Sequence, residues 1–287
     1  MIALFGVGVV FVSVFGGFLL AGGPILLLIQ PAEILIITGA ALGVLLIGTP
    51  RHYLSRIASG LRKAIRAAPA GGKDHYMDLL TLQFEVFVNI KKHGLLAIEQ
   101  DISRPESSTI FSKYPSFLAR THGVRFLADA LRLLVDGGVP PADLETLLDR
   151  ELETHHEEVA KPSGILTRMG DTLPGLGIVA AVLGIVISMQ GIDGPASEMG
   201  QNVAAALVGT FLGVLLSYGF VQPLAMNLDF QGQAEGNYLE CIKSGIVTMA
   251  KGAPPTVAVE FARRVIFSHE RPALEEVEAA IQRVSPR

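Results

Sequence analysis

The sequence lacks tryptophan, contains a single cysteine and has two long stretches without lysine or arginine. Because Cys241 is alone, a disulfide or a cysteine-built zinc site within one chain is excluded. The 23 basic residues form two blocks, sixteen from Arg51 to Arg168 and seven from Lys243 to Arg287, and residues 1–50 and 169–242 have none. Only 17% of the residues are charged, fewer than the roughly 25% typical of soluble proteins. This distribution predicts a membrane protein with two water-facing blocks.

Several classes of function have no support in the sequence. The net charge of −4 gives no general basic surface, so we expect no nucleic-acid partner. No phosphate-binding glycine loop or nucleophile motif occurs, and we expect neither an enzyme, nor a catalytic residue, nor a cofactor. His155 and His156 are adjacent and would point to different faces of a helix, so no metal site is predicted from them.

Four segments are long and apolar enough to cross a membrane, because the hydrocarbon core is about 30 Å thick and a helix rises about 1.5 Å per residue. They are Ile2–Leu20, Ala32–Gly48, Leu173–Met189 and Val203–Met226. The first has no basic region before it, and we interpret residues 2–20 as a retained helix rather than a cleaved signal peptide. Basic residues from Arg51 to Arg66 follow span two directly, which places that end, and with it both termini, in the cytoplasm.

The predicted fold class is an all-α membrane protein with four transmembrane helices, a helical cytoplasmic domain between spans two and three, and a cytoplasmic C-terminal tail. The corresponding parts are residues 1–48, 49–170, 171–226 and 227–287. Periodic apolar residues and proline positions predict the helices of the water-facing parts. These helices are 74–100, which Gly94 ends or breaks, Phe117–Val135, one that begins at Pro140-Pro141, one from Pro254-Pro255 to about Phe267, and one that begins at Arg271-Pro272.

No span has an ionisable side chain near its middle. Glu33 lies at the outer end of span two and Asp171 at the inner end of span three. Charged groups at mid-membrane usually mark ion relays, so this chain is predicted to need another subunit for its ion-binding carboxylate. Thr210, deep in span four, is the candidate to line an ion pathway. The alternative is that its hydroxyl bonds a carbonyl of its own helix, four residues earlier.

Small residues recur at the spacing that allows close helix packing. Gly39 and Gly43 form one pair, and Gly209 and Gly213 form another. Such pairs serve either packing within one chain or packing between subunits, and their spacing favours neither.

Two prolines accompany the third and fourth spans. Pro174 follows Asp171 and Thr172, which predicts a helix cap with proline in the first turn. Pro223 lies inside the long apolar segment of span four, where it removes a backbone hydrogen bond. A static kink and a hinge are the two interpretations of Pro223.

Two blocks of the chain closely resemble the third and fourth spans of the flagellar motor stator A subunit, the MotA family. They are GDTLPGLGIVAAVLG at residues 170–184 and VGTFLGVLLSYGF at residues 208–220, the latter followed by Pro223. Further matches occur in order along nearly the whole chain. They are Gln30–Glu33, Tyr76–Leu80, Ile110-Phe111 with Tyr114-Pro115, Glu153–His155, Ala253–Pro255, Val259–Phe261 and Glu270–Pro272.

The resemblance implies a multi-pass protein of the bacterial inner membrane, in a ring of five copies around two copies of a B subunit. The B subunit of such a stator carries the membrane aspartate that takes the ion and a domain that binds peptidoglycan. Ion flow drives the ring against the rotor switch protein and so generates torque for motility. The implied partners are therefore the B subunit, the rotor switch protein, further copies of this chain and membrane lipid.

The same resemblance assigns roles to single residues. Pro174 and Pro223 match two mechanically important prolines, Asp171 matches an acid before the first proline, and Thr210 matches a pore-facing threonine. In sodium-driven relatives a threonine occupies the position of Ala181. Because alanine offers no oxygen to a dehydrating cation, protons are the expected ion.

Contact with the rotor is implied for Lys91 and Glu99, with the adjacent Lys92 sharing the role. An ordinary solvated helix face is the alternative for these residues. At the level of the whole chain, an energy transducer of outer-membrane processes like the ExbB/TolQ family, which has three spans, is the alternative function. A self-sufficient transporter is disfavoured, because midplane polar sites and broken helices in two similar halves are not found in the sequence.

Overall fold

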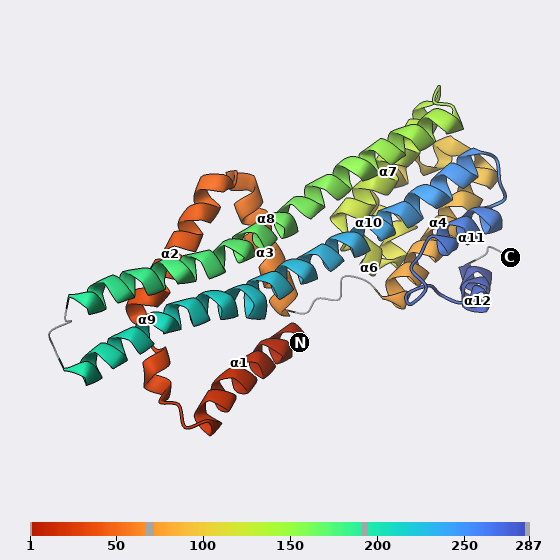
Figure 1. Cartoon of the computed structure of the whole chain (residues 1–287). Helices are drawn as coiled ribbons and strands as arrows, with labels where there is room; N and C mark the ends of the chain where they lie inside the picture. Colours follow the sequence, from red (N-terminus) through yellow and green to blue (C-terminus); the bar gives the residue numbers. More distant parts are fainter. Residues whose placement is uncertain (1, 67–71, 191–194, 285–287) are drawn as a thin grey trace. The chain divides into compact units, whose positions relative to one another are not determined.

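The computed structural model describes residues 2–66, 72–190 and 195–284, and within these ranges it contains helices and turns but no strand (Figure 1). The all-α fold class expected from the sequence is confirmed. The helices belong to two compact units. The first unit comprises Met1–Ala68 and Glu158–Phe230, and the second comprises Pro69–Glu157 and Gln231–Arg287.

The first unit holds the apolar helices. Its N-terminal part contains α1 (Ile2–Leu20), the short helix η1 (Ile25–Leu28), α2 (Pro31–Gly48) and α3 (Arg51–Arg66). Its second part is formed by α8 (Pro141–Met189), α9 (Ala196–Leu216), the π-helical turn η5 (Ser217–Val221) and α10 (Gln222–Ala250), and α8 and α10 have residues in both units. Four segments of the described chain are long and apolar enough to cross a membrane, which confirms the expected number.

Span three begins differently from the expectation. Asp171, Thr172 and Pro174 all lie inside α8, which continues through Pro174 as one helix. The Thr172 hydroxyl donates to the carbonyl of Met169 at 2.7 Å instead of capping a helix start. The expected cap is therefore wrong. The fixed φ angle of proline is compatible with a helix, and what Pro174 removes is a single backbone hydrogen bond.

Span four is interrupted rather than regular. The helix α9 ends at Leu216, and the π-helical turn η5 separates it from α10, in which Pro223 is the second residue. The N–H of Gln222 donates to the Ser217 carbonyl, five residues earlier. Because Pro223 has no N–H to offer the Gly219 carbonyl, the helical pattern is broken at this point, and a π-helical turn is one form that such an interruption takes.

The packing of α8 against α9 depends on glycine. A Cβ atom on Gly213 would lie 2.6 Å from the Leu173 carbonyl oxygen and 2.9 Å from the Gly177 Cα atom. A Cβ atom on Gly177 would lie 2.7 Å from the Gly209 carbonyl oxygen. Real Cβ atoms essentially never approach other atoms this closely. The two backbones therefore meet with no side chain between them.

The two pairs of small residues serve different surfaces. Gly209 and Gly213 face α8 at the contact just described, so this pair is used within the chain. A Cβ atom on Gly39 or on Gly43 would meet nothing within 4 Å in the described part of the chain. Packing between subunits stays a prediction for the Gly39 and Gly43 pair.

A hydrophobic core holds the second unit together. The helix α4 (Lys73–His93) contributes the fully buried Leu79, Leu80 and Phe87 to it, and packs against α11 (Pro255–Arg264) and α12 (Leu274–Val284). The remaining helices complete the unit with the adjoining parts of α8 and α10. They are η2 (Leu95–Ile98), α5 (Glu99–Ser103), η3 (Pro105–Ser107), η4 (Phe111–Lys113), α6 (Pro115–Leu118) and α7 (Thr121–Asp136).

Two expected helices of this unit have breaks. Gly94 follows the end of α4 with a φ of +84°, a conformation that favours glycine, so the break expected at Gly94 is confirmed. The single helix expected over Phe117–Val135 is wrong, because α6 ends at Leu118 and α7 begins at Thr121. Between them, the guanidinium of Arg120 lies 4.5 Å from the centre of the Tyr238 ring on α10. A contact with a distant residue therefore accompanies this break.

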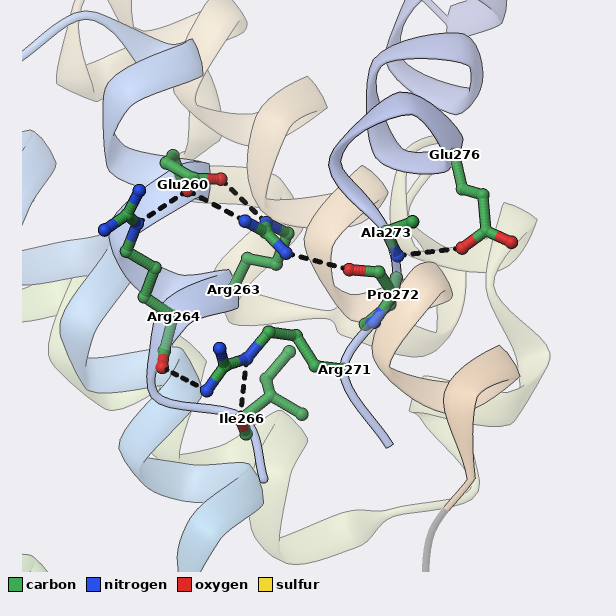
Figure 2. A network of polar contacts seen from close by, with 8 residues as sticks. All are labelled: Glu260, Arg263, Arg264, Ile266, Arg271, Pro272, Ala273 and Glu276. Carbon is green, nitrogen blue, oxygen red and sulfur yellow. Dashed lines mark hydrogen bonds and ion pairs between the residues drawn. The ribbon is translucent and has the colours of Figure 1, made fainter. Parts of the chain in front are cut away.

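Figure 2 shows the turn between α11 and α12. Arg271 donates from Nε to the Ile266 carbonyl and from Nη2 to the Arg264 carbonyl, both at 3.0 Å. Carbonyls at the end of a helix have no partner within the helix, and Arg271 satisfies one at the end of α11 and one just beyond it. The helix α11 ends at Arg264, earlier than the expected Phe267. At the start of α12, the Glu276 carboxylate accepts from the N–H of Ala273 at 2.8 Å.

Glu260 joins the two arginines at the end of α11. Arg263 donates to its carboxylate from Nε at 2.7 Å and from Nη2 at 2.9 Å, and Arg264 donates from Nε at 2.7 Å. The hydrogen bonds from Arg263 lower the pKa of Glu260 to about 2, with a further contribution from Arg264 and an opposing one from partial burial. Arg263 also donates to the Pro272 carbonyl at 2.9 Å, so the ionised cluster fixes the turn (Figure 2).

Replacing Gly177 with alanine should destabilise the first unit by about 1–3 kcal/mol. The added Cβ atom would meet backbone atoms of α9, which cannot rotate away as a side chain can. The change Gly164→Ala in the same helix is the matched control, since a Cβ atom there meets nothing within 4 Å. Thermal unfolding of the detergent-purified chain, followed by circular dichroism, compares the two variants. Equal stability of both would show that the glycine contact is not required.

Candidate functional site

Pro174 and the π-helical turn are joined by a hydrogen bond. Because Pro174 has no N–H, the carbonyl of Gly170, four residues earlier, loses its helical partner. The Ser217 hydroxyl donates to this carbonyl at 2.7 Å. Ser217 is fully buried and is the first residue of η5. A side chain of the interrupted fourth span thus satisfies the carbonyl that the proline of the third span leaves open.

A second hydrogen bond connects the same two helices. Gln222, which directly precedes Pro223, donates from Nε2 to the Asp171 carboxylate at 2.9 Å. A Cβ atom on Gly170 would lie 3.0 Å from the Gln222 Cγ atom, so the helices are in close contact here. We call the residues that make these contacts the proline junction. They are Gly170, Asp171, Pro174, Ser217, Gln222 and Pro223.

Thr210 and Ala181 lie at the glycine contact between α8 and α9. A Cβ atom on Gly177 would lie 3.2 Å from the Thr210 Cα atom, and one on Gly209 would lie 3.3 Å from the backbone nitrogen of Ala181. Ala181 is buried and Thr210 is half-buried. The structure therefore brings together the two residues for which the sequence suggested a part in ion passage, although it assigns neither a role.

The Thr210 hydroxyl differs from those of Thr38 and Ser188 in the apolar helices. Thr38 donates to the Ile34 carbonyl at 2.5 Å, and Ser188 donates to the Gly184 carbonyl at 2.8 Å, each to the residue four earlier. Within the described part of the chain, Thr210 has no such bond. A role for Thr210 in ion passage stays a prediction.

Glu33 is a buried carboxylate whose surroundings were missed in the sequence. It lies in the first turn of α2, and 7% of its surface is exposed. A Cβ atom on Gly209 would lie 3.1 Å from the Glu33 Cγ atom, and one on Gly184 would lie 3.4 Å from Glu33 Oε1. The side chain therefore packs against α8 and α9. Glycines on these two helices leave room for the Glu33 side chain. They lie far from Glu33 in the sequence, so no local pattern indicated the contact.

The residues implied in rotor contact lie where α4 ends and α5 begins. Lys91 and Lys92 are in the last turn of α4, and Glu99 is the first residue of α5. All three are exposed, and none forms an ion pair with the described part of the chain. Leu96, which lies between them in the chain, is 72% exposed. The exposure fits both a partner surface and a solvated face, so the role stays a prediction.

The other lysines of this unit pair with carboxylates of the described chain. Glu85 pairs with Lys113, and Asp149 accepts from Lys243 at 2.6 Å. The lack of an ion pair with any described residue distinguishes Lys91 and Lys92 from these lysines.

Comparison with known proteins gives the family. The family model described as Motility protein A N-terminal matches residues 4–94, and that of the MotA/TolQ/ExbB proton channel family matches residues 119–239. Motility protein A of Escherichia coli (strain K12) is 39% identical over 284 residues, which are 99% of this chain and 96% of the relative. The chain belongs to the motility protein A family. Chemotaxis protein LafT of Vibrio parahaemolyticus is 36% identical over 273 residues, 95% of each protein.

Solved structures share the fold of this member of the motility protein A family. MotAB of C. jejuni matches with a TM-score of 0.78 at 20% identity, over 94% of this chain and 98% of that chain. The MotAB stator complex of Bacillus subtilis matches with a TM-score of 0.72 at 23% identity, over 90% and 92%. Together with the four apolar segments, family membership makes this chain a multi-pass membrane protein of a proton-channel family.

Replacing Ser217 with alanine should destabilise the protein by about 1–3 kcal/mol, because the buried Gly170 carbonyl then has no hydrogen-bond donor. Ser188→Ala is the matched control. Ser188 is also buried, but the carbonyl that it contacts, that of Gly184, keeps its ordinary helical bond. The midpoints of thermal unfolding of both variants, measured in detergent, should differ clearly. If they fall by the same amount, the proline junction does not depend on Ser217.

Proposed function

We propose that this chain is the stator A subunit of a bacterial flagellar motor. With a B subunit it forms an ion channel that converts ion flow into torque on the rotor. The observation that carries this proposal is the identity of 39% and 36% with Motility protein A and chemotaxis protein LafT along nearly the whole chain. In this proposal the chain lies in the bacterial inner membrane with both termini in the cytoplasm, which the basic residues that follow span two favour.

The ion-binding carboxylate belongs to the partner in this proposal. Residues 172–192 and 199–228, which contain most of spans three and four, have no Asp or Glu. Glu33, whose side chain packs beside Gly184 and Gly209, sits in the first turn of α2. Two solved relatives are MotAB complexes, which supports a partner of the B type. We expect that partner to have one span with a membrane aspartate and a peptidoglycan-binding domain.

Several copies of this chain surround the B subunit in this proposal, with five as the expected number. The apolar helices have side chains that one chain alone leaves uncovered. On α8 and α9 they include Ile178, Val182, Ile187, Leu207 and Val214. The open Gly39 and Gly43 pair on α2 offers a second surface where a neighbouring helix can approach closely. Lipid and neighbouring subunits are the partners whose chemistry fits such surfaces.

The ion is proposed to be a proton. Ala181 gives no oxygen at the position where sodium-driven relatives are expected to have one, and the Thr210 hydroxyl is a single neutral ligand. A dehydrated sodium ion needs several oxygen ligands, whereas a proton needs only a carboxylate and water. The proline junction lies at the inner end of the same two helices. We propose that it transmits a conformational change near Thr210 to the cytoplasmic part of the chain.

The exposed charges of Lys91, Lys92 and Glu99 are proposed to contact the rotor switch protein. A surface that holds charges of both signs steers a partner with the complementary pattern into one orientation. Lys91 and Lys92 supply point charges rather than the planar, two-pronged donor of an arginine, so the contact is electrostatic rather than bidentate.

An energy transducer of the ExbB/TolQ type is the alternative, since the second matching family model includes those proteins. The match of residues 4–94 to the motility-specific N-terminal model and the presence of four candidate spans favour the stator.

The function can be tested in a flagellated strain from which its own stator subunits have been deleted. Production of this chain with its B subunit should restore swimming, a protonophore should stop it, and removal of sodium should leave it unchanged. A failure to swim despite normal membrane levels of both subunits would contradict the stator function. Swimming that stops when sodium is removed would contradict the choice of ion.

Reversal of charge at the rotor contact should reduce swimming speed to about half or less, because the complementary charges of the partner are then repelled. The variants are Lys91→Glu and Glu99→Lys, with Glu278→Lys on the exposed face of α12 as the control. Membrane amounts and co-purification with the B subunit should be unchanged in all three. Normal swimming of both test variants would assign these residues to an ordinary solvated face.

A further inference from the structure

Three side chains with metal-ligating atoms meet in the second unit. His122 is the second residue of α7, His155 lies in α8, and Glu235 lies in α10. One ligand atom from each of them lies within 4.8 Å of the others. His122 Nδ1 is 3.7 Å from Glu235 Oε1, and the two imidazole rings have centroids 5.5 Å apart. Three separate helices therefore contribute to one cluster, outside both the proline junction and the exposed end of α4.

We propose that His122, His155 and Glu235 bind a divalent transition-metal ion, with zinc as the ion of best fit. Two imidazole nitrogens and one carboxylate oxygen are a ligand set that zinc accepts, with a water molecule as the fourth ligand. Magnesium and calcium prefer sites made of oxygen alone, so two histidines disfavour them. The adjacent His156 is exposed and does not belong to the cluster, so the site uses only one of the two neighbouring histidines.

The geometry needs only a small adjustment to hold zinc. Bonds of about 2.1 Å in a tetrahedral arrangement place the ligand atoms about 3.4 Å apart. The pair at 3.7 Å is close to this value, and a separation of 4.8 Å has to shorten by somewhat more than 1 Å. The side chain of His122 is 62% exposed at the start of its helix, so rotation of its ring is not opposed by packing.

Two acidic side chains flank the cluster along its helices. Glu151, one helical turn before His155, has a raised pKa, first because of desolvation and then because Asp129 of α7 lies nearby. The nearest cation in the chain sequence, Arg120, has its guanidinium over the Tyr238 ring.

A bound ion would fasten the start of α7 to α8 and α10. An ion that binds the folded state and not the unfolded chain raises the free energy of unfolding. Once the ion concentration exceeds the dissociation constant, this increase grows with the logarithm of the concentration. The inference concerns metal binding and is independent of the proposed motor function. Its test needs neither a flagellum nor a B subunit.

Zinc binding should be measured on the full-length chain, purified in detergent and freed of metal with a chelator. Competition with a chromophoric chelator should detect one zinc ion per chain in the wild type. His122→Ala and Glu235→Gln each remove one ligand, and each should weaken zinc binding by about tenfold or more. The matched controls His156→Ala and Glu157→Gln change exposed neighbours on α8 and should keep the wild-type affinity.

A second measurement separates ligation from damage to the fold. Zinc should raise the midpoint of thermal unfolding of the wild type and of His156→Ala, and should leave that of His122→Ala unchanged. The midpoints without zinc should be the same for all three, because His122 and His156 are exposed. Equal zinc affinity in the wild type, His122→Ala and Glu235→Gln would overturn the proposal. So would a loss of affinity in His156→Ala as large as that in His122→Ala.

Discussion

The contact of backbone with backbone between α8 and α9 is the constraint on which the first unit depends. Gly177 and Gly213 face each other there, and a side chain on either would clash with backbone that cannot move aside. In a membrane, where apolar side chains gain nothing by leaving lipid, such close approach is a main source of helix association. The same contact brings Thr210 beside Ala181 and leaves space for the Glu33 side chain.

Where the two prolines interrupt these helices, two defects compensate each other. Pro174 leaves the Gly170 carbonyl without a donor, and Ser217, at the start of the π-helical turn before Pro223, supplies one. Unsatisfied carbonyls are costly in a membrane, so prolines are tolerated where a neighbouring helix provides the missing bond. The two prolines are therefore part of one set of contacts. The two sequence blocks that resemble the MotA family are the segments that meet in these contacts.

The sequence predicted features that depend on local composition. The number of apolar segments, the glycine that ends α4 and the proline that opens α8 follow from run length and backbone preference. Features that depend on distant residues were missed. The helix break near Arg120 accompanies a contact with Tyr238, the surroundings of Glu33 come from Gly184 and Gly209, and His155 meets a histidine and a glutamate from other helices. No local pattern contains such information.

The central proposal is that spans three and four form a close-packed pair without an acid of their own, and that the carboxylate which takes the ion comes from a second subunit. Ion flux into lipid vesicles measures this directly. Vesicles that contain this chain alone should show no proton flux above that of empty vesicles, and vesicles with the active complex of this chain and its B subunit should conduct. Proton flux through the chain alone would contradict the account.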